Sequence, residues 1–335
     1  MAQFFDGFEQ FRTLDEESPA AYMKMAGYST RGVLSAGQGR IGRSICLFTL
    51  FSAFERKWTW SGDTITVGFA CMQQKRGALF GFKVGDTTGR DVPSTTIYTD
   101  PQTGFVTIRN QNGDLDIGYV TPLPKRWYYY EISANRSTGV VTVQVNGKDD
   151  VAFTLDADVK AAAEITLVFN PFDMMPSFPA EANYEEDTKQ YDDMYVQDGG
   201  RLGPIQISGR LPSGDVAVGW NVSDEDPAYP HNRMVGVLPP DPSNRFIFTG
   251  VNDVYDAFNS SDTLPDNGAI IAQGLVTLVR KATSDPVSVI ANIDGNTVTM
   301  SNIGRQWEYR YTLLSPAGYD KTSIEAAVFG VRSVI

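Results

Sequence analysis

The sequence has few of the residues that build catalytic and metal centres. Its 335 residues include two cysteines, Cys46 and Cys71, and one histidine, His231. Two cysteines exclude a disulfide framework, and because they lie in separate apolar stretches we expect buried free thiols. A single histidine excludes metal sites built on two or more histidines and leaves one candidate for a His-based triad.

Positive charge and long apolar runs are also scarce. The 28 Lys and Arg residues are outnumbered by 40 Asp and Glu residues, which gives a net charge of −12. A field of this sign repels phosphate backbones and anionic membranes, so we expect neither nucleic-acid nor membrane binding. No apolar stretch approaches the roughly 18 residues of a membrane span, and the N-terminal residues show neither a basic n-region nor a long apolar h-region, so we expect no signal peptide. We expect a soluble protein made in the cytoplasm.

Aromatic and turn-forming residues are abundant instead. The chain contains 15 Tyr, 19 Phe and 5 Trp, together with 31 Gly and 18 Pro. Aromatic side chains suit pleated, half-buried surfaces, and Gly and Pro suit the turns between strands. The composition therefore predicts an all-β protein. Its length favours two domains, which we place at residues 1–200 and 201–335.

Apolar residues alternate with polar ones between Ile65 and Val168, as expected for strands with one packed face and one wet face. In the strand that begins at Trp127, alternation assigns Tyr128, Tyr130, Ile132 and Ala134 to the core, and Trp127, Tyr129, Glu131 and Ser133 to solvent. The Asn146-Gly147 pair then predicts a tight hairpin, because both residues tolerate positive φ. Strands on both sides of this hairpin complete a three-stranded meander.

Other segments receive weaker assignments. Further strands are expected at 65–72, 78–84, 95–98, 104–109, 165–170, 194–197, 205–208, 245–248, 269–282, 287–293, 297–301, 307–314 and 326–331. A short helix is expected at 156–164, with Asp156 as its cap. The proline-rich and acidic segment 171–191 predicts a long surface loop.

No set of residues supports catalysis or metal binding. The G-x-S-x-G elbow of serine hydrolases is absent, and no strand carries the paired carboxylates that glycosidases need. Asp192-Asp193 and Glu185-Glu186-Asp187 are interpreted as solvated acidic loops, since adjacent strand residues face opposite ways. We therefore predict no catalytic residue, no metal ligand and no cofactor. Trp127 and Tyr129 are the candidate contact residues, because outward rings can stack on a sugar or pack against a partner.

Three segments in order resemble a family of phage virion proteins. The first is Trp127 to Val145 with the following Asn-Gly turn, which resembles a laminin-G/concanavalin-like jelly roll. The second is Tyr191 to Asp215, which resembles the strand that closes this jelly roll, and the third is the remainder through Val331. The opening Asp6 to Phe11 is also similar, although Glu9 replaces the usual second Asp. The resemblance implies a jelly roll followed by a smaller β domain, and it supplies no catalytic residue.

The resemblance therefore predicts a structural component of a phage virion, tail-associated as a fibre, tip or collar. It would be made in the host cytoplasm and carried in the particle in several copies or as a homo-oligomer. Its partners would be other virion proteins and a host-surface glycan. Two alternatives remain: a carbohydrate-binding adhesin, and a polysaccharide depolymerase with a carboxylate pair in a groove.

Overall fold

The computed structural model divides the chain into two compact units, Met1–Ile207 and Ser208–Ile335. It describes residues 3–11, 19–40, 43–47, 52–85, 93–171, 188–224, 226–238, 240–260, 263–264, 268–314 and 319–335. The chain is nearly all β, as the composition predicts. Among the described residues, no helix has both the length and the apolar character needed to cross a bilayer.

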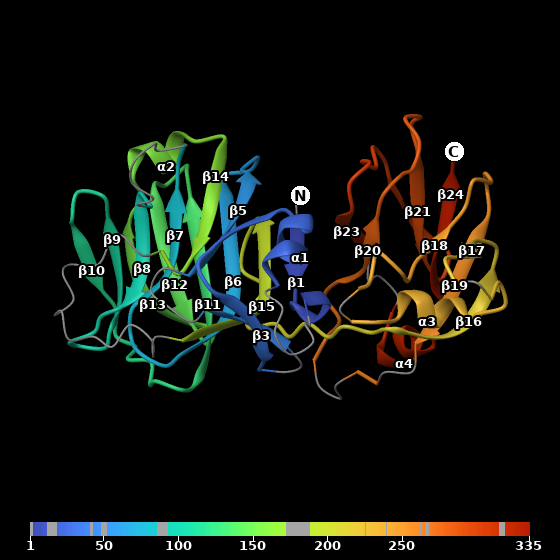
Figure 1. Cartoon of the computed structure of the whole chain (residues 1–335). Helices are drawn as coiled ribbons and strands as arrows, with labels where there is room; N and C mark the ends of the chain where they lie inside the picture. The colour runs from blue at the N-terminus through green and yellow to red at the C-terminus, as the bar shows by residue number, and fades with distance from the viewer. Residues whose placement is uncertain are drawn as a thin grey trace. The chain divides into compact units, whose positions relative to one another are not determined.

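The first unit is a sandwich of two antiparallel sheets (Figure 1). The first sheet has the order β13 (Lys148–Thr154), β12 (Val140–Val145), β11 (Trp127–Asn135), β6 (Thr64–Gln73), β15 (Lys189–Asp198), β4 (Arg43–Leu47) and β3 (Leu34–Gln38), with β1 (Gln3–Asp6) also paired to β15. The second has the order β10 (Leu115–Ile117), β9 (Val106–Asn110), β8 (Thr95–Thr99), β7 (Ala78–Lys83), β14 (Glu164–Phe169), β5 (Ala53–Thr59) and β2 (Tyr28–Arg31). This is the predicted jelly roll.

Aromatic rings join the two sheets. Phe69 of β6 and Tyr191 of β15 project from the first sheet, and their ring centroids lie 5.5 and 5.7 Å from that of Phe169 on β14. Tyr191 also meets Phe54 of β5 edge-on at 5.4 Å, and its hydroxyl donates to the Leu79 carbonyl oxygen at 2.7 Å. All three phenylalanines and Tyr191 are fully buried. These contacts fix which faces of the two sheets form the core.

The predicted meander is confirmed. β11 pairs with β12, and β12 pairs with β13, around a turn in which Asn146 and Gly147 have φ of 51° and 76°. The core face of β11 is also as predicted for Tyr130, Ile132 and Ala134, whereas Tyr128 is only partly buried. The short helix α2 covers Ala157–Ala161. Asp156 precedes it without capping it, because its carboxylate accepts the Thr95 hydroxyl at 2.7 Å.

Several expectations from the sequence differ from the structure. The early elements β1 to β5, the helix α1 (Ala20–Met25) and the 3-10 turn Glu9–Phe11 were not anticipated. Residues 189–191 of the expected loop belong to β15, while 172–187 lie outside the described residues. Residues 205–208 form no strand, because they run across a sheet instead of pairing with its edge. The Cys71 side chain is buried, and the Cys46 side chain lies outside the described part.

The second unit is built around one sheet and two ribbons. The sheet has the order β16 (Pro212–Val218), β19 (Tyr255–Ser260), β24 (Phe329–Val334), β21 (Ser288–Ile293) and β22 (Asn296–Met300). The ribbons are β17 (Asn221–Val222) with β18 (Ile247–Phe248), and β20 (Gln273–Val279) with β23 (Glu308–Leu314). Leu275 and Val279 of β20 pack on a core that includes Val289 and Ala291 of β21. The predicted hairpin at Asp294-Gly295 joins β21 to β22.

Two short helices complete this unit, α3 (His231–Val235) and α4 (Lys321–Ala326). The single histidine begins α3, where its Nδ1 lies 2.5 Å from Oδ2 of the fully buried Asp256. The other oxygen of Asp256 accepts the amides of Gly219 and Trp220 at 2.6 and 2.8 Å. His231 therefore helps to hold α3 and the β16–β17 turn on β19.

The centre of the first sheet is buried on both faces, so a larger side chain introduced there tests its packing directly. A Cβ added at Gly68 of β6 would overlap the ring of Tyr195, whereas nothing lies within 4 Å of one added at Gly200. We predict that Gly68→Ala lowers the free energy of unfolding by about 1–3 kcal/mol through overpacking. Gly200→Ala, the matched control, should change it by less than about 0.5 kcal/mol. Urea denaturation of both variants measures the difference, and equal stabilities would contradict this packing.

Candidate functional site

A crossing segment covers the face of the first sheet on which the sequence placed its exposed aromatic residues. We call residues 199–207 the strap. The Gly199 carbonyl accepts the Thr66 hydroxyl at 2.7 Å, the Gly203 amide donates to Glu131 at 2.8 Å, and the Ile207 amide donates to Asp193 at 2.6 Å. The domain boundary placed after residue 200 thus differs from the division after Ile207, because the strap packs on the first unit.

The strap changes the position of both predicted contact residues. Tyr129 is 2% exposed and packs with Ala70, Tyr195 and Ile205. Trp127 is partly buried and packs against the same cluster. The prediction that the Tyr129 side chain faces solvent is therefore wrong, because alternation along one strand cannot reveal a segment that crosses the sheet. Neither ring offers an open platform for a sugar.

The position of Glu131 also differs from the prediction. The sequence assigned it to solvent, yet it is fully buried beneath the strap, where Oε1 accepts the Tyr195 hydroxyl at 2.5 Å. Its Oε2 has no hydrogen-bond partner within the described residues. Burial, followed by the hydrogen bond to Glu131, raises the pKa of Tyr195 far above its usual value, so this phenol stays neutral. Glu131 and Tyr195 thus fasten the strap to the sheet.

The Asp192-Asp193 pair has a similar role. Both side chains are fully buried at an irregularity in β15, so the expectation of a solvated acidic loop is wrong for this pair. Asp192 accepts the Arg40 amide at 2.8 Å, and Asp193 lies 2.8 Å from the Arg40 guanidinium. Arg40 also donates to the Ile205 carbonyl at 2.5 Å. The pair therefore ties the β3–β4 hairpin to the strap.

A different part of the first unit remains available for binding. We call residues 118–126, which follow the edge strand β10, the anchored loop. Asp150 of β13 accepts the amides of Tyr119 and Val120 at 2.6 and 2.7 Å. The Gly118 amide donates to the Val106 carbonyl at 2.8 Å, and the Lys125 amide donates to the Gln73 carbonyl at 2.7 Å. The backbone of this loop is therefore fixed at both ends.

Several side chains of the anchored loop are exposed on this fixed backbone. Tyr119 is 86% exposed and Leu123 is 59% exposed, and Arg126 is also exposed. On the adjoining strand β10, Leu115 and Ile117 are about half exposed, at 50% and 48%. Scattered single apolar residues are ordinary on protein surfaces, but an aromatic ring on a rigid loop is typical of a recognition site.

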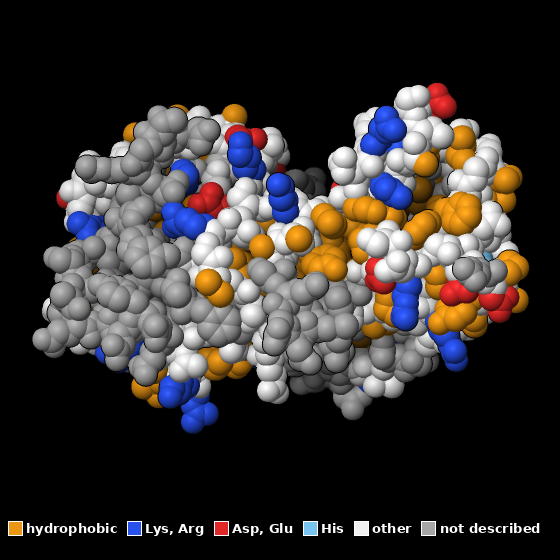
Figure 2. All heavy atoms as spheres, in the orientation of Figure 1, with side chains coloured by type: hydrophobic (Ala, Val, Ile, Leu, Met, Phe, Trp, Pro, Cys, Tyr) orange, Lys and Arg blue, Asp and Glu red, His pale blue; other side chains and the backbone are white. Residues whose placement is uncertain are grey.

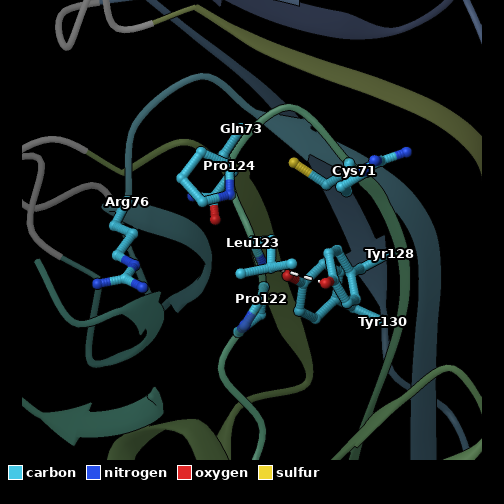
Figure 3. Close-up of a pocket in the computed structure, with 9 residues that line it drawn as sticks. Cys71, Gln73, Arg76, Pro122, Leu123, Pro124, Tyr128 and Tyr130 are labelled. Atoms are coloured by element: carbon cyan, nitrogen blue, oxygen red, sulfur yellow. Dashed lines mark hydrogen bonds between the residues drawn. The ribbon is translucent and has the colours of Figure 1, made fainter. Parts of the chain in front are cut away.

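Beside the loop lies a shallow hollow, which Figure 3 shows in close-up. We call it the arginine hollow. It is a surface depression without an enclosed cavity, and it is lined by Cys71, Gln73, Arg76, Pro122, Leu123, Pro124, Arg126, Tyr128 and Tyr130. In Figure 3, Arg76 lies on one side of the Pro122–Pro124 turn and the two tyrosines on the other. The Tyr128 hydroxyl accepts the Leu123 amide at 3.0 Å, which holds this turn in place.

Sequence reasoning missed this site, although two dipeptides in the sequence signal it. Lys75-Arg76 follows β6, and Lys125-Arg126 precedes β11. β6 and β11 are antiparallel neighbours that pair Trp127 with Met72, so the two basic dipeptides meet at one end of the sheet. Predicting this strand pairing would have placed the arginines together.

The described residues contain no group of three or more His, Cys, Asp or Glu side chains placed to bind a metal ion. Of the acidic clusters considered from the sequence, Glu185-Glu186-Asp187 lies outside the described residues. Within the described part, the anchored loop and the arginine hollow are the features best suited to ligand recognition.

Asp150 allows a test of loop anchoring. Burial raises the pKa of Asp150, while its hydrogen bonds from Val120 and Tyr119 lower it. We predict that Asp150→Ala accelerates amide hydrogen exchange at Tyr119 and Val120 and costs about 1 kcal/mol of stability, because two part-buried donors lose their acceptor. The control is Asp149→Ala, since the Asp149 side chain is 84% exposed. Unchanged exchange in Asp150→Ala would contradict this anchoring.

No protein-family model and no curated protein matches this sequence. Among solved structures, it is similar to an alginate lyase, Aly36B, in complex with alginate trisaccharide. The sequence identity is 11% and the TM-score is 0.38, and the match covers 58% of this chain and 97% of that chain. It is similar to the Caenorhabditis elegans galectin LEC-6 with 10% identity, coverage of 45% and 95%, and a TM-score of 0.32. A sialidase matches with 13% identity and a TM-score of 0.40, but this chain spans only 18% of its length.

Proposed function

We propose that the protein is a carbohydrate-binding adhesion protein that acts without catalysis, and that its first unit contacts the glycan through the anchored loop. The observation that carries the proposal is the 86% exposed ring of Tyr119, held on a backbone that Asp150 fixes. The strap-covered face, with Trp127 and Tyr129, has no part in this contact.

Physical chemistry supports a sugar as the ligand of such a ring. Pyranose rings have apolar faces that pack on flat aromatic side chains, and their hydroxyl groups need polar partners at the rim. Tyr119 supplies the flat ring, and Arg126 on the same loop supplies donors. Because the loop backbone is already fixed, binding costs little conformational entropy. A shallow surface of this kind suits a glycan that the protein holds and does not cleave.

Tyr119 gives the direct test of this proposal. Tyr119→Ala should weaken binding to a glycan identified on an array by at least about tenfold, or roughly 1.4 kcal/mol. Tyr119→Phe should retain the affinity, because it keeps the ring. Leu115→Ala, an exposed change on the adjoining strand, is the control and should bind as the wild type. Titration calorimetry measures all three, and wild-type affinity in Tyr119→Ala would overturn the proposal.

A second candidate role is assembly into a phage particle as a tail-associated component in several copies. Besides the family resemblance, one surface feature favours it. Figure 2 shows apolar side chains gathered on the second unit around β20 and β23. Val276 of β20 is exposed, and other exposed apolar residues of this unit are Val216, Val218, Phe248, Val251, Ile271, Val298, Val334 and Ile335. Apolar surface of this kind is typical of protein–protein contacts. The two roles are compatible, since a particle-borne adhesin would have both.

Mass spectrometry of purified particles tests the assembly role. We expect peptides of this chain in particles produced by the strain that encodes it, at a copy number above one per particle. Intact, infectious particles that lack the chain would contradict it. A separate assay distinguishes the adhesin from the depolymerase alternative. The pure protein is incubated with the polysaccharide that it binds, and the products are analysed. An adhesin leaves the length of the polysaccharide unchanged.

A further inference from the structure

Two arginines line the arginine hollow, Arg76 and Arg126. Arg40, Arg201, Arg310 and Arg332 each form an ion pair with a carboxylate, and Arg56, Arg136 and Arg210 donate to backbone carbonyls. Within the described part of the chain, Arg76 and Arg126 form neither kind of contact. The Nε atom of Arg76 is buried without a hydrogen-bond partner.

The arginine hollow carries positive charge in a chain whose net charge is negative. Acidic residues outnumber basic ones by 40 to 28, so carboxylates are available to pair with most cations. The guanidinium of Arg76 nevertheless packs against the backbone of Gly104, where a side chain would collide with it. Arg126, at the end of the anchored loop, is exposed and also lines the hollow. Two guanidinium groups thus line one small surface.

The hollow also has neutral groups suited to a sugar ring. Pro122, Leu123 and Pro124 provide apolar contacts, and Tyr128 provides a hydroxyl. Burial raises the pKa of Tyr130 well above its usual value, so its phenol is neutral and adds no negative charge to the hollow. The hollow therefore combines two fixed positive charges with apolar and hydroxyl contacts.

We infer that the arginine hollow binds the carboxylate of an acidic saccharide, with Arg76 and Arg126 as its ligands. This inference rests on the proposed function and names its ligand class. A guanidinium group presents a planar fork of donors that matches a carboxylate, and the contact is charge-assisted. The Pro122–Pro124 turn packs against the ring that carries the carboxylate. Tyr119, on the same loop, stacks on a neighbouring sugar.

The net charge of −12 does not oppose this contact at physiological salt. Charges on the rest of the surface are screened over a Debye length of about 8 Å at 0.15 M ionic strength. The groups nearest the ligand therefore decide its affinity. The same net charge disfavours long polyanions such as nucleic acids, whose many phosphates extend beyond the hollow. A short saccharide with at least one carboxylate fits this combination.

The experiment compares matched glycans on the full chain. The probes are sialyllactose and an oligogalacturonate, their carboxyl-reduced counterparts, and a sulfated oligosaccharide of equal length. We expect at least one carboxylated probe to bind at least about tenfold more tightly than its reduced counterpart and than the sulfated probe. Equal binding of the carboxylated and reduced forms, preference for sulfate, or no binding of any carboxylated probe would overturn the inference.

Arginine variants identify where the carboxylate binds. Arg126→Gln and Arg76→Gln should each reduce binding of the carboxylated probe at least about fivefold and leave the weaker binding of the reduced probe unchanged. Arg126→Lys should restore part of the loss, because it keeps the charge without the fork. Arg305→Gln, an exposed arginine of the second unit, makes the same charge change and should have no effect. Equal losses for Arg305→Gln would overturn the inference.

The outcomes separate this inference from the proposed function. If glycans bind through Tyr119 with no preference for a carboxylate, the adhesin proposal stands and the acidic specificity fails. If carboxylated probes bind through the arginines while Tyr119→Ala has no effect, the hollow stands and the stacking role fails. Circular dichroism of each variant confirms that it is folded.

Discussion

The aromatic layer between the two sheets of the first unit is the constraint on which the other features depend. Phe54, Phe69, Phe169 and Tyr191 come from strands far apart in sequence and meet at centroid distances of 4.4 to 5.7 Å. Each such pair contributes about 0.5–1.5 kcal/mol beyond the burial of its area. Because this layer fixes the inner faces of β6 and β15, it also fixes which residues point outward. Gly68, Glu131 and Tyr195 therefore meet on the opposite face, where the strap covers them.

The strap covers one surface of the first unit, the outer face of the first sheet, and leaves a second surface, the anchored loop, open. The outer face of the first sheet is closed by the strap through Thr66, Glu131 and Asp193, and its carboxylates hold protein groups. The anchored loop, in contrast, uses Asp150 only to fix its backbone and leaves Tyr119 and Arg126 exposed. The binding surface that we propose thus lies at one end of the sandwich, where strands end and loops begin.

The sequence predicted the fold class and much of the first unit because those features depend on local patterns. Alternation and the Asn146-Gly147 turn located β11, β12 and β13, and Asp294-Gly295 located the second hairpin. Local patterns could not locate the strap, because its contacts with Glu131 and Asp193 span 72 and 14 positions of sequence. For the same reason Tyr129 was assigned to solvent. The arginine hollow depends on the pairing of β6 with β11, which no single segment encodes.

Amide hydrogen exchange with and without bound glycan most directly tests the central claim that ligand recognition occurs at the anchored loop and the arginine hollow. The full chain would be measured alone and saturated with the tightest-binding saccharide. We predict new protection in residues 118–126 and around Arg76, with exchange in the strap and in the second unit unchanged. Protection confined to the strap or to the second unit, with none in the anchored loop, would contradict the account.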